Sequence, residues 1–323
     1  MKRRMFFVSV FAAACLPRGE AAQGAAKVYR IGWVTAQRAA SLVPYLDAFR
    51  GALTDLGYTE GGDLLIEYRY GDDAIERVPG LAVELQRIPV DLIVAQGAAA
   101  FEIHGLTIPV VYGISADPVL AGFAESLARP RGNMTGLTFM AVEMNGKRLE
   151  LLWEIIPELR RVAIVGNPEH PGSHLERGFS EQTGRRLGVE IAYFPTRNRD
   201  ELAAAFAAMA EDPPQAVSLL ADGLAVQNQQ DIIDFAMSHR IPVISGWPVF
   251  AQSGAICTYG PRFTESYRRM AYYVDRILKG AKPVDLPIEQ PTKFELVVNL
   301  KSAKALGIII PQSVETRANR VIE

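Results

Sequence analysis

The chain has 323 residues, of which 49% are hydrophobic and 22% are charged, and this composition excludes a disordered or fibrous protein. Two domains of about 150 residues fit such a length best. The formal net charge of −2 gives no basic surplus, so binding to nucleic acid is not expected.

The first 26 residues have the layout of a secretory signal peptide. Basic residues at 2–4 precede an apolar run from Met5 to Leu16, and small residues surround Ala22. The run is shorter than the stretch of about 20 residues that a transmembrane helix needs. We therefore expect cleavage near Ala22 and a periplasmic protein without stable membrane insertion. The alternative is a lipoprotein anchored through Cys15.

From residue 28 onward, short apolar stretches alternate with amphipathic ones, which predicts βα units around a parallel sheet. In the first half we expect strands at 28–34, 64–70, 92–95, 110–112 and 134–139. Apolar residues spaced three and four apart predict a helix that begins near Leu42 and ends at Gly57, and a second helix covers 79–86.

The second half repeats this alternation. It predicts strands at 162–165, 189–194, 217–220 and 243–244, with helices over 142–156, 173–187, 200–210 and 226–239. Each half also contains an Ile-Pro-Val strand start, at residues 108–110 and 241–243, which suggests duplication, although many α/β proteins show such echoes.

Clusters of proline and glycine near 129–135 and beyond Thr258 predict several crossings between two lobes. We assign residues 27–140 and 259–282 to lobe I, and residues 141–258 and 283–323 to lobe II. Several crossings between the lobes would form a hinge.

Motifs of enzyme chemistry are missing from the sequence. There is no GxGxxG after the first strand, no GxxxxGK[ST] and no GxSxG. His170 and His174 stand four apart, but Pro171 and Gly172 interrupt the helix that would align them, so a solvated loop is favoured over a metal site. Cys257 is interpreted as a buried structural thiol. We expect no catalytic residue, metal or cofactor.

Candidate ligand-binding residues follow the carboxyl ends of the predicted strands, because ligands of open α/β sheets bind there. They are Thr35, Ala36, Gln37, Tyr70, Gln96, Gly97, Ser115, Ala116, Asp117, Asn167, Asp222, Trp247 and Tyr259. The two aspartates can either contact a ligand or cap a helix. The tyrosines and Trp247 can instead belong to the core. This set of hydroxyl, amide and aromatic groups suits a small polar or aromatic ligand.

Four sequence blocks resemble one known family. They are LARPRGNMTG at 127–136, ILKGAKP at 277–283, LPIEQP at 286–291 and VNLKSAKALG at 298–307. They resemble the uncharacterised-type ABC transporter substrate-binding proteins, which include binders of tryptophan and other aromatic amino acids. At 96–99 this chain has Gln-Gly-Ala-Ala where many members have a Gly-Thr pair, so it lacks a hydroxyl that would contact an amino-acid carboxylate.

The resemblance implies a type I periplasmic binding fold, in which two Rossmann-like lobes with parallel sheets close on a ligand. It also implies a function as the solute-binding component of an ABC importer, with a permease and its ATPase as partners. We expect a monomer that captures an aromatic or branched amino acid, or an aromatic or organic acid. The alternatives are a ligand-sensing periplasmic module and an α/β enzyme that acts on a small metabolite.

Overall fold

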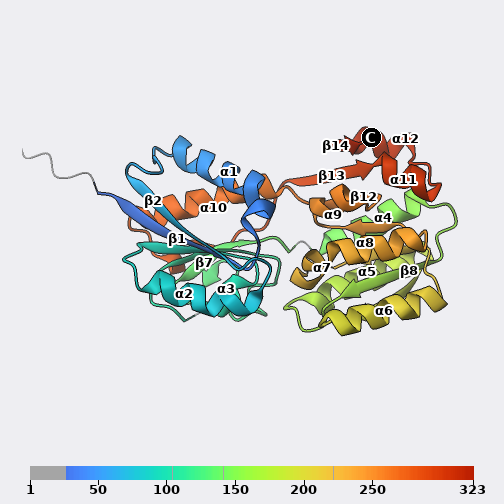
Figure 1. Ribbon diagram of the computed structural model, residues 1–323, viewed down its shortest axis with the longest axis horizontal. Coiled ribbons are helices and arrows are strands. Elements are labelled where there is room, and N and C mark those ends of the chain that lie inside the picture. Colours follow the sequence, from blue (N-terminus) through green and yellow to red (C-terminus); the bar gives the residue numbers. More distant parts are fainter. Residues whose placement is uncertain (1–26, 104, 141, 221) are drawn as a thin grey trace, which may run out of the picture.

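The chain folds into two α/β lobes, each built around its own sheet (Figure 1). The computed structural model describes residues 27–103, 105–140, 142–220 and 222–323. The expected signal peptide and Cys15 lie outside these residues, so both stay predictions. Within the described ranges, no helix has the length and apolar character needed to cross a membrane.

Lobe I contains five parallel strands in the order β2-β1-β3-β4-β7. Their bounds are β1 (Tyr29–Thr35), β2 (Leu64–Tyr70), β3 (Leu92–Gln96), β4 (Val110–Ile114) and β7 (Met134–Thr138). A small hairpin, β5 (Ala124–Ser126) and β6 (Arg129–Pro130), precedes β7. Strands β3, β4 and β7 are buried along their whole length, which explains the nearly unbroken apolar sequences of β3 and β4.

Helices cover both faces of this sheet (Figure 1). One face packs against α1 (Ala39–Asp55) and α10 (Phe263–Leu278), and the aromatic side chains of Trp33, Phe49 and Tyr267 fill that interface. The other face packs against α2 (Val78–Gln86) and α3 (Ala99–Glu102), with η1 (Ile75–Arg77) before α2. Helix α1 ends as expected, because Gly57 follows it with a φ of +97°.

Lobe II contains seven strands in the order β14-β13-β12-β11-β10-β8-β9. The strands are β8 (Arg161–Gly166), β9 (Glu190–Pro195), β10 (Ala216–Leu219), β11 (Val243–Ser245), β12 (Cys257–Pro261), β13 (Phe294–Asn299) and β14 (Arg320–Ile322). All neighbours are parallel except β12 and β13. The helices are α4 (Glu143–Ile155), α5 (Ser173–Leu187), α6 (Arg199–Glu211), α7 (Gly223–Gln227), α8 (Gln229–Ser238), α9 (Pro248–Ser253), α11 (Leu300–Leu306) and α12 (Gln312–Arg317).

These two sheets confirm the predicted α/β class, and three segments of chain connect them. They lie between β7 and α4, between β12 and α10, and between η2 (Pro283–Asp285) and β13. Two boundaries differ from our assignment. Strand β12 pairs with β11 and β13, so residues 259–261 belong to lobe II. Ile288 packs in the core of lobe I, so the chain leaves this lobe after residue 288 and not at 283.

One expected helix is also wrong in detail. The stretch expected as a single helix over 226–239 is part of two helices, α7 and α8, which meet at Asn228. Asn228 departs from helical geometry, with φ −106° and ψ 25°, and its side chain donates a hydrogen bond of 2.8 Å to the carbonyl oxygen of Leu224. Helix α7 begins earlier than expected, at Gly223, where the side chain of Asp222 caps its first turn.

Candidate functional site

A cavity of about 400 Å³ lies between the two lobes. Its walls are the loops that follow β1, β3 and β4 of lobe I and β8, β10 and β11 of lobe II. The structure brings together nine of the predicted residues in its lining: Thr35, Ala36, Gln37, Gln96, Gly97, Ser115, Asn167, Asp222 and Trp247. This is the place where the carboxyl ends of parallel strands in both lobes meet.

The part of the lobe I wall formed by Thr35, Gln37 and Gln96 is polar and is held by its own hydrogen bonds. Thr35 is fully buried, and its hydroxyl donates to Oε1 of Gln96 over 2.6 Å, which joins the ends of β1 and β3. The same hydroxyl oxygen accepts a bond of 3.2 Å from the backbone N–H of Gln37. The Oε1 atom of Gln37 is buried and has no partner among the described residues. A ligand that donates a hydrogen bond would satisfy it.

Asp222 and Arg197 are the charged residues of the lobe II wall, and Arg197 is paired with Glu169 and Glu201. The carboxylate of Asp222 accepts a bond of 3.1 Å from the backbone N–H of Leu224 and so caps α7. The residue is only 6% exposed, and burial raises the pKa of its carboxyl to about 6. No ion pair joins it to any described cation. The capping alternative therefore describes the observed contact, and ligand contact stays a prediction for a residue that also lines the cavity.

Trp247 connects the cavity with the hinge. It follows β11 and lines the cavity, and its ring stacks on Phe263 at 4.6 Å between centroids with an interplanar angle of 11°. Phe263 is the first residue of α10, directly after the second crossing. Trp247 consequently packs against the core of lobe I as well as that of lobe II.

Two predicted residues of the loop after β4 lie outside the cavity lining. Ala116 is fully buried, and its carbonyl oxygen accepts a bond of 2.7 Å from the hydroxyl of Thr138. The carboxylate of Asp117 accepts bonds from the backbone N–H groups of Val119 and Leu120, at 2.8 and 3.0 Å. For Asp117 the capping alternative describes the observed contacts.

The two predicted tyrosines, Tyr70 and Tyr259, also lie outside the cavity lining. Tyr70 stacks on Tyr68 with centroids 6.0 Å apart, and both rings pack against the core of lobe I. Tyr259 lies in β12 beside Phe294, with centroids 6.3 Å apart. For both tyrosines the core alternative describes the packing.

His170 is the most informative cavity residue that the sequence analysis did not predict, because its neighbours Pro168 and Glu169 and also His174 are exposed as expected while its own ring is largely buried. It lines the cavity, and its Nδ1 atom is buried without a partner among the described residues. Burial lowers the pKa of the imidazole to about 4, so the ring is neutral near pH 7. Its position after β8, three residues beyond Asn167, was the available signal. The other missed lining residues are Asp73, Ile75, Ala98, Phe101, Glu102, Pro171, Arg197, Gly223, Leu224, Val226 and Gln227.

One edge of the cavity is closed by direct contact between the lobes. The backbone N–H of Asp117 donates to the carbonyl oxygen of Pro171 over 3.1 Å. The next residue, Gly172, has a φ of +94°, and a Cβ atom there would lie 2.6 Å from Cε of Met140 and 3.1 Å from Cβ of Asp117. Close approach of the lobes at this turn therefore requires glycine.

Groups for metal or thiol chemistry are not assembled in the described part of the chain. No cluster of three or more histidine, cysteine, aspartate or glutamate side chains suited to a metal ion occurs among those residues. Cys257 is fully buried, and burial raises the pKa of its thiol to about 12, which disfavours the reactive thiolate.

Comparisons with known proteins agree with this architecture. The chain is 22% identical over 264 residues to a tyrosine-binding protein of Clostridioides difficile (strain R20291), covering 80% of this chain and 75% of the relative. A conserved domain protein from Vibrio cholerae superposes with a TM-score of 0.83 at 23% identity, covering 91% of this chain and 100% of the other. An ABC domain in complex with L-Trp from Streptococcus pneumonia gives a TM-score of 0.83 at 21% identity, with coverages of 92% and 100%.

The structural likenesses confirm the predicted fold, the two Rossmann-like lobes of type I periplasmic binding proteins. The sequence match extends over almost the same region. A family model described as ABC transporter substrate binding protein matches residues 38–322. The chain therefore belongs to the family of ABC transporter substrate-binding proteins.

Proposed function

We propose that the cavity between the lobes captures an amino acid with an aromatic side chain, and that the closed protein delivers it to the permease of an ABC importer in the periplasm. The lobes close around the ligand because it contacts both walls, and closure is favoured only by the difference in affinity between the two states. The names of two relatives, one binding tyrosine and one bound to L-Trp, support this ligand class.

The buried carboxylate of Asp222 is the observation that most directly supports this proposal. A buried carboxylate without a cationic partner is costly, and burial already raises its pKa to about 6. A ligand ammonium group would supply the missing positive charge and a hydrogen bond, so binding would recover the cost of burying the carboxylate. An amine-bearing ligand thus fits this cavity better than an organic acid without an amine.

Aromatic walls favour a planar side chain on that ligand. Trp247 and Phe101 line the cavity from opposite lobes, and each ring is supported by another aromatic residue, Phe263 and Phe123 respectively. Rings fixed in this way offer stacking surfaces with little loss of side-chain entropy. The unpartnered polar atoms of Gln37 and His170 would bond the polar groups of the ligand.

Binding without turnover is part of the proposal. The described cavity lining holds carboxylates and a neutral histidine but no cysteine or lysine as a nucleophile, and its serine, Ser115, has no hydrogen bond to His170. We propose that the protein acts as a monomer and that its partners are the permease and, through it, the ATPase.

Calorimetric titration tests the ligand class. L-tyrosine, L-tryptophan, L-phenylalanine, L-leucine and benzoate are titrated into the wild type, and an aromatic amino acid should bind without being consumed. Asp222→Asn should weaken its affinity by roughly a hundredfold, as expected for losing one partner of a buried charge pair. Asp117→Asn is the matched control, because Asp117 also caps a turn but lies outside the cavity.

The control should keep the wild-type affinity. Binding of benzoate in preference to the amino acids, or an equal loss in both variants, would contradict the role of Asp222. Conversion of a bound ligand to a product would favour the enzyme alternative.

A further inference from the structure

The charged side chains that line the cavity between the lobes are mostly acidic. Three are carboxylates, those of Asp73, Glu102 and Asp222, and one is a cation, Arg197. His170 is neutral near pH 7, because burial lowers the pKa of its imidazole to about 4. The lining therefore has a net negative charge.

The single cation of the lining is already paired. The guanidinium of Arg197 lies 3.2 Å from the carboxylate of Glu169 and 2.9 Å from that of Glu201. Two carboxylates share this one positive charge, and all three side chains are partly exposed. Among the described lining residues, no cation is left to pair with a carboxylate of the ligand.

Two carboxylates of the lining are not paired. Asp73 lies 2.5 Å from Nε of Arg38, but Glu102 and Asp222 have no ion pair with a described residue. Glu102 is exposed on α3 of lobe I, and Asp222 is buried at the start of α7 of lobe II. Both lobes therefore attract a positive group on the ligand and repel a negative one.

Several neutral donors of the lining are also engaged within the protein. The hydroxyl of Thr35 bonds to Gln96 over 2.6 Å, and the N–H of Gly97 bonds to the carbonyl oxygen of Gly113 over 2.8 Å. The hydroxyl of Ser115 remains, but a neutral donor does not offset the charge of a carboxylate. The lining thus holds an ammonium group better than it holds an acid group.

One buried cation lies beside Trp247 but outside this lining. Arg148 lines a separate pocket of about 20 Å³ together with Trp247. Its guanidinium already donates to Asn145 and to the carbonyl oxygen of Tyr259. Such a pocket has room for about one water molecule, so Arg148 is not accessible to the carboxylate of a ligand in the cavity.

We propose that the site recognises the ring and the ammonium group of its ligand but not a carboxylate, so that it also binds arylalkylamines, in which a short chain joins an aromatic ring to an amine. The inference rests on the proposed function, because the ring would contact Trp247 and Phe101 and the ammonium group would pair with Asp222 in both kinds of ligand. An amino acid brings no net charge into the negative cavity, whereas the amine brings one positive charge. The amine should therefore bind more tightly.

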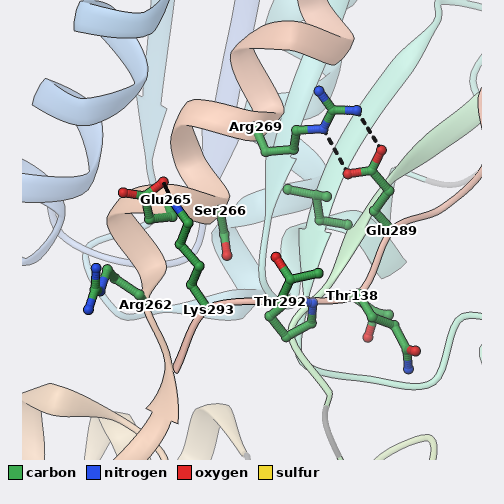
Figure 2. Close-up of a pocket in the computed structure, with 11 residues that line it drawn as sticks. Thr138, Arg262, Glu265, Ser266, Arg269, Glu289, Thr292 and Lys293 are labelled. Carbon is green, nitrogen blue, oxygen red and sulfur yellow. Dashed lines mark hydrogen bonds and ion pairs between the residues drawn. The ribbon is translucent and has the colours of Figure 1, made fainter. Parts of the chain in front are cut away.

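A second cavity, of about 240 Å³, offers no competing site for an ammonium group (Figure 2). Both of its carboxylates are paired, Glu289 with Arg269 at 2.6 Å and Glu265 with Lys293 at 2.9 Å. Arg262 also lines this cavity, so cations outnumber carboxylates there. We therefore expect one amine to bind per protein molecule.

Calorimetric titration of three ligand pairs tests the inference. Each pair has the same ring, with and without the acid group: L-tyrosine and tyramine, L-tryptophan and tryptamine, L-phenylalanine and phenethylamine. In the pair that binds best, the amine should bind roughly tenfold more tightly than the amino acid. Added sodium chloride should reduce this preference, because Glu102 is exposed to solvent and its field is screened.

A charge variant tests whether the lining causes the preference. Glu102→Gln should reduce the preference for the amine by roughly threefold, because it removes one unpaired negative charge at an exposed position. Glu211→Gln on α6 is the matched control, since Glu211 is also exposed, has no ion pair with a described residue and lies outside the cavity. The control should keep the wild-type preference.

The outcomes separate this inference from the proposed function. Binding of an amino acid more tightly than its amine would overturn the inference and leave the proposed function standing. Binding of the amines alone would support the inference but overturn the amino acid as the ligand. Absence of binding by all six compounds would overturn both. An unchanged preference in Glu102→Gln would contradict selection by the charge of the lining.

Discussion

Asp222 shows how one side chain carries two roles at the residue scale. Its carboxylate caps α7 through the N–H of Leu224 and also faces a cavity in which no described cation pairs with it. Because burial raises its pKa to about 6, part of the population is protonated and neutral in mildly acidic solution. Only the ionised form attracts an ammonium group, so ligand binding should depend on pH.

We expect the affinity for an amine-bearing ligand to rise with pH and to level off above pH 7. Below a pKa of about 6 the ionised fraction falls tenfold per pH unit, so the affinity at pH 5 should be roughly tenfold lower than at pH 7. Dissociation constants measured by calorimetry between pH 5 and 8 test this. The profile of Asp222→Asn should be flat over that range, and a wild-type profile without a slope would refute the assignment.

At the scale of elements, helix α4 is anchored by a buried cation. Arg148 is 3% exposed, and its guanidinium donates to Oδ1 of Asn145 on the same helix and, over 3.2 Å, to the carbonyl oxygen of Tyr259 on β12. Asn145 in turn donates to Glu176 of α5 over 3.1 Å. One network therefore joins α4, α5 and the strand that leads into the second connection.

Arg148→Ala should lower the free energy of unfolding by about 3 kcal/mol, because it breaks a buried, hydrogen-bonded charge network. Urea denaturation monitored by circular dichroism measures this change. Lys147→Ala on the same helix is the control, since its side chain is half exposed and pairs only with Glu150. Its effect should stay within about 0.5 kcal/mol. Equal losses for both variants would show that the network contributes nothing specific.

A single methyl group added at the turn before α5 should lower both the stability of the protein and its affinity for the ligand. Gly172→Ala adds a Cβ atom against Met140 and Asp117 at the contact between the lobes, at a φ of +94°. Gly188→Ala, at the other end of α5, adds a Cβ atom at a φ of +71° with nothing within 4 Å. Both should lose about 1 kcal/mol of stability from backbone strain, but only Gly172→Ala should also weaken ligand affinity.

Chemical denaturation measures the loss of stability in both variants, and calorimetry measures the loss of ligand affinity. Unchanged ligand affinity in Gly172→Ala would mean that the contact between Asp117 and Pro171 does not contribute to the ligand-bound state.

For the whole molecule, Trp247 is the side chain that joins ligand cavity, lobe II and hinge. Its ring lines the cavity and stacks on Phe263, so it packs against the cores of both lobes. The position of a ligand stacked on Trp247 would therefore depend on the position of α10. This helix belongs to lobe I although it follows most of lobe II in the sequence.

Trp247→Leu should weaken the affinity for an aromatic amino acid by roughly fivefold, because an aromatic pair contributes about 1 kcal/mol beyond its buried area. The loss should be smaller for an aliphatic amino acid, which cannot stack. Trp153→Leu is the control, because Trp153 is 52% exposed on α4. Calorimetry provides both affinities, and equal losses for aromatic and aliphatic ligands would argue against stacking.

The sequence alone determined the alternation of strands and helices, because burial of strands and amphipathic periodicity are local properties. It also placed Thr35 near Gln96, and Asn167 near Asp222, since the carboxyl ends of parallel strands share an edge of their sheet. Contacts between residues far apart in the sequence could not be predicted from local sequence patterns. The pairing of β12 with β13, which puts residues 259–261 in lobe II, required a partner more than 30 residues away.

Only the tertiary structure distinguished residues with the same local signature. Asp117 and Asp222 both follow a strand and both cap the next turn, yet only Asp222 faces the cavity. His170 lies in a polar loop next to Pro171, which predicts solvent exposure, but its Nδ1 atom is buried where the residue lines the cavity between the lobes. The approach of two lobes decides both outcomes, because burial at an interface depends on the partner surface and not on neighbours in sequence.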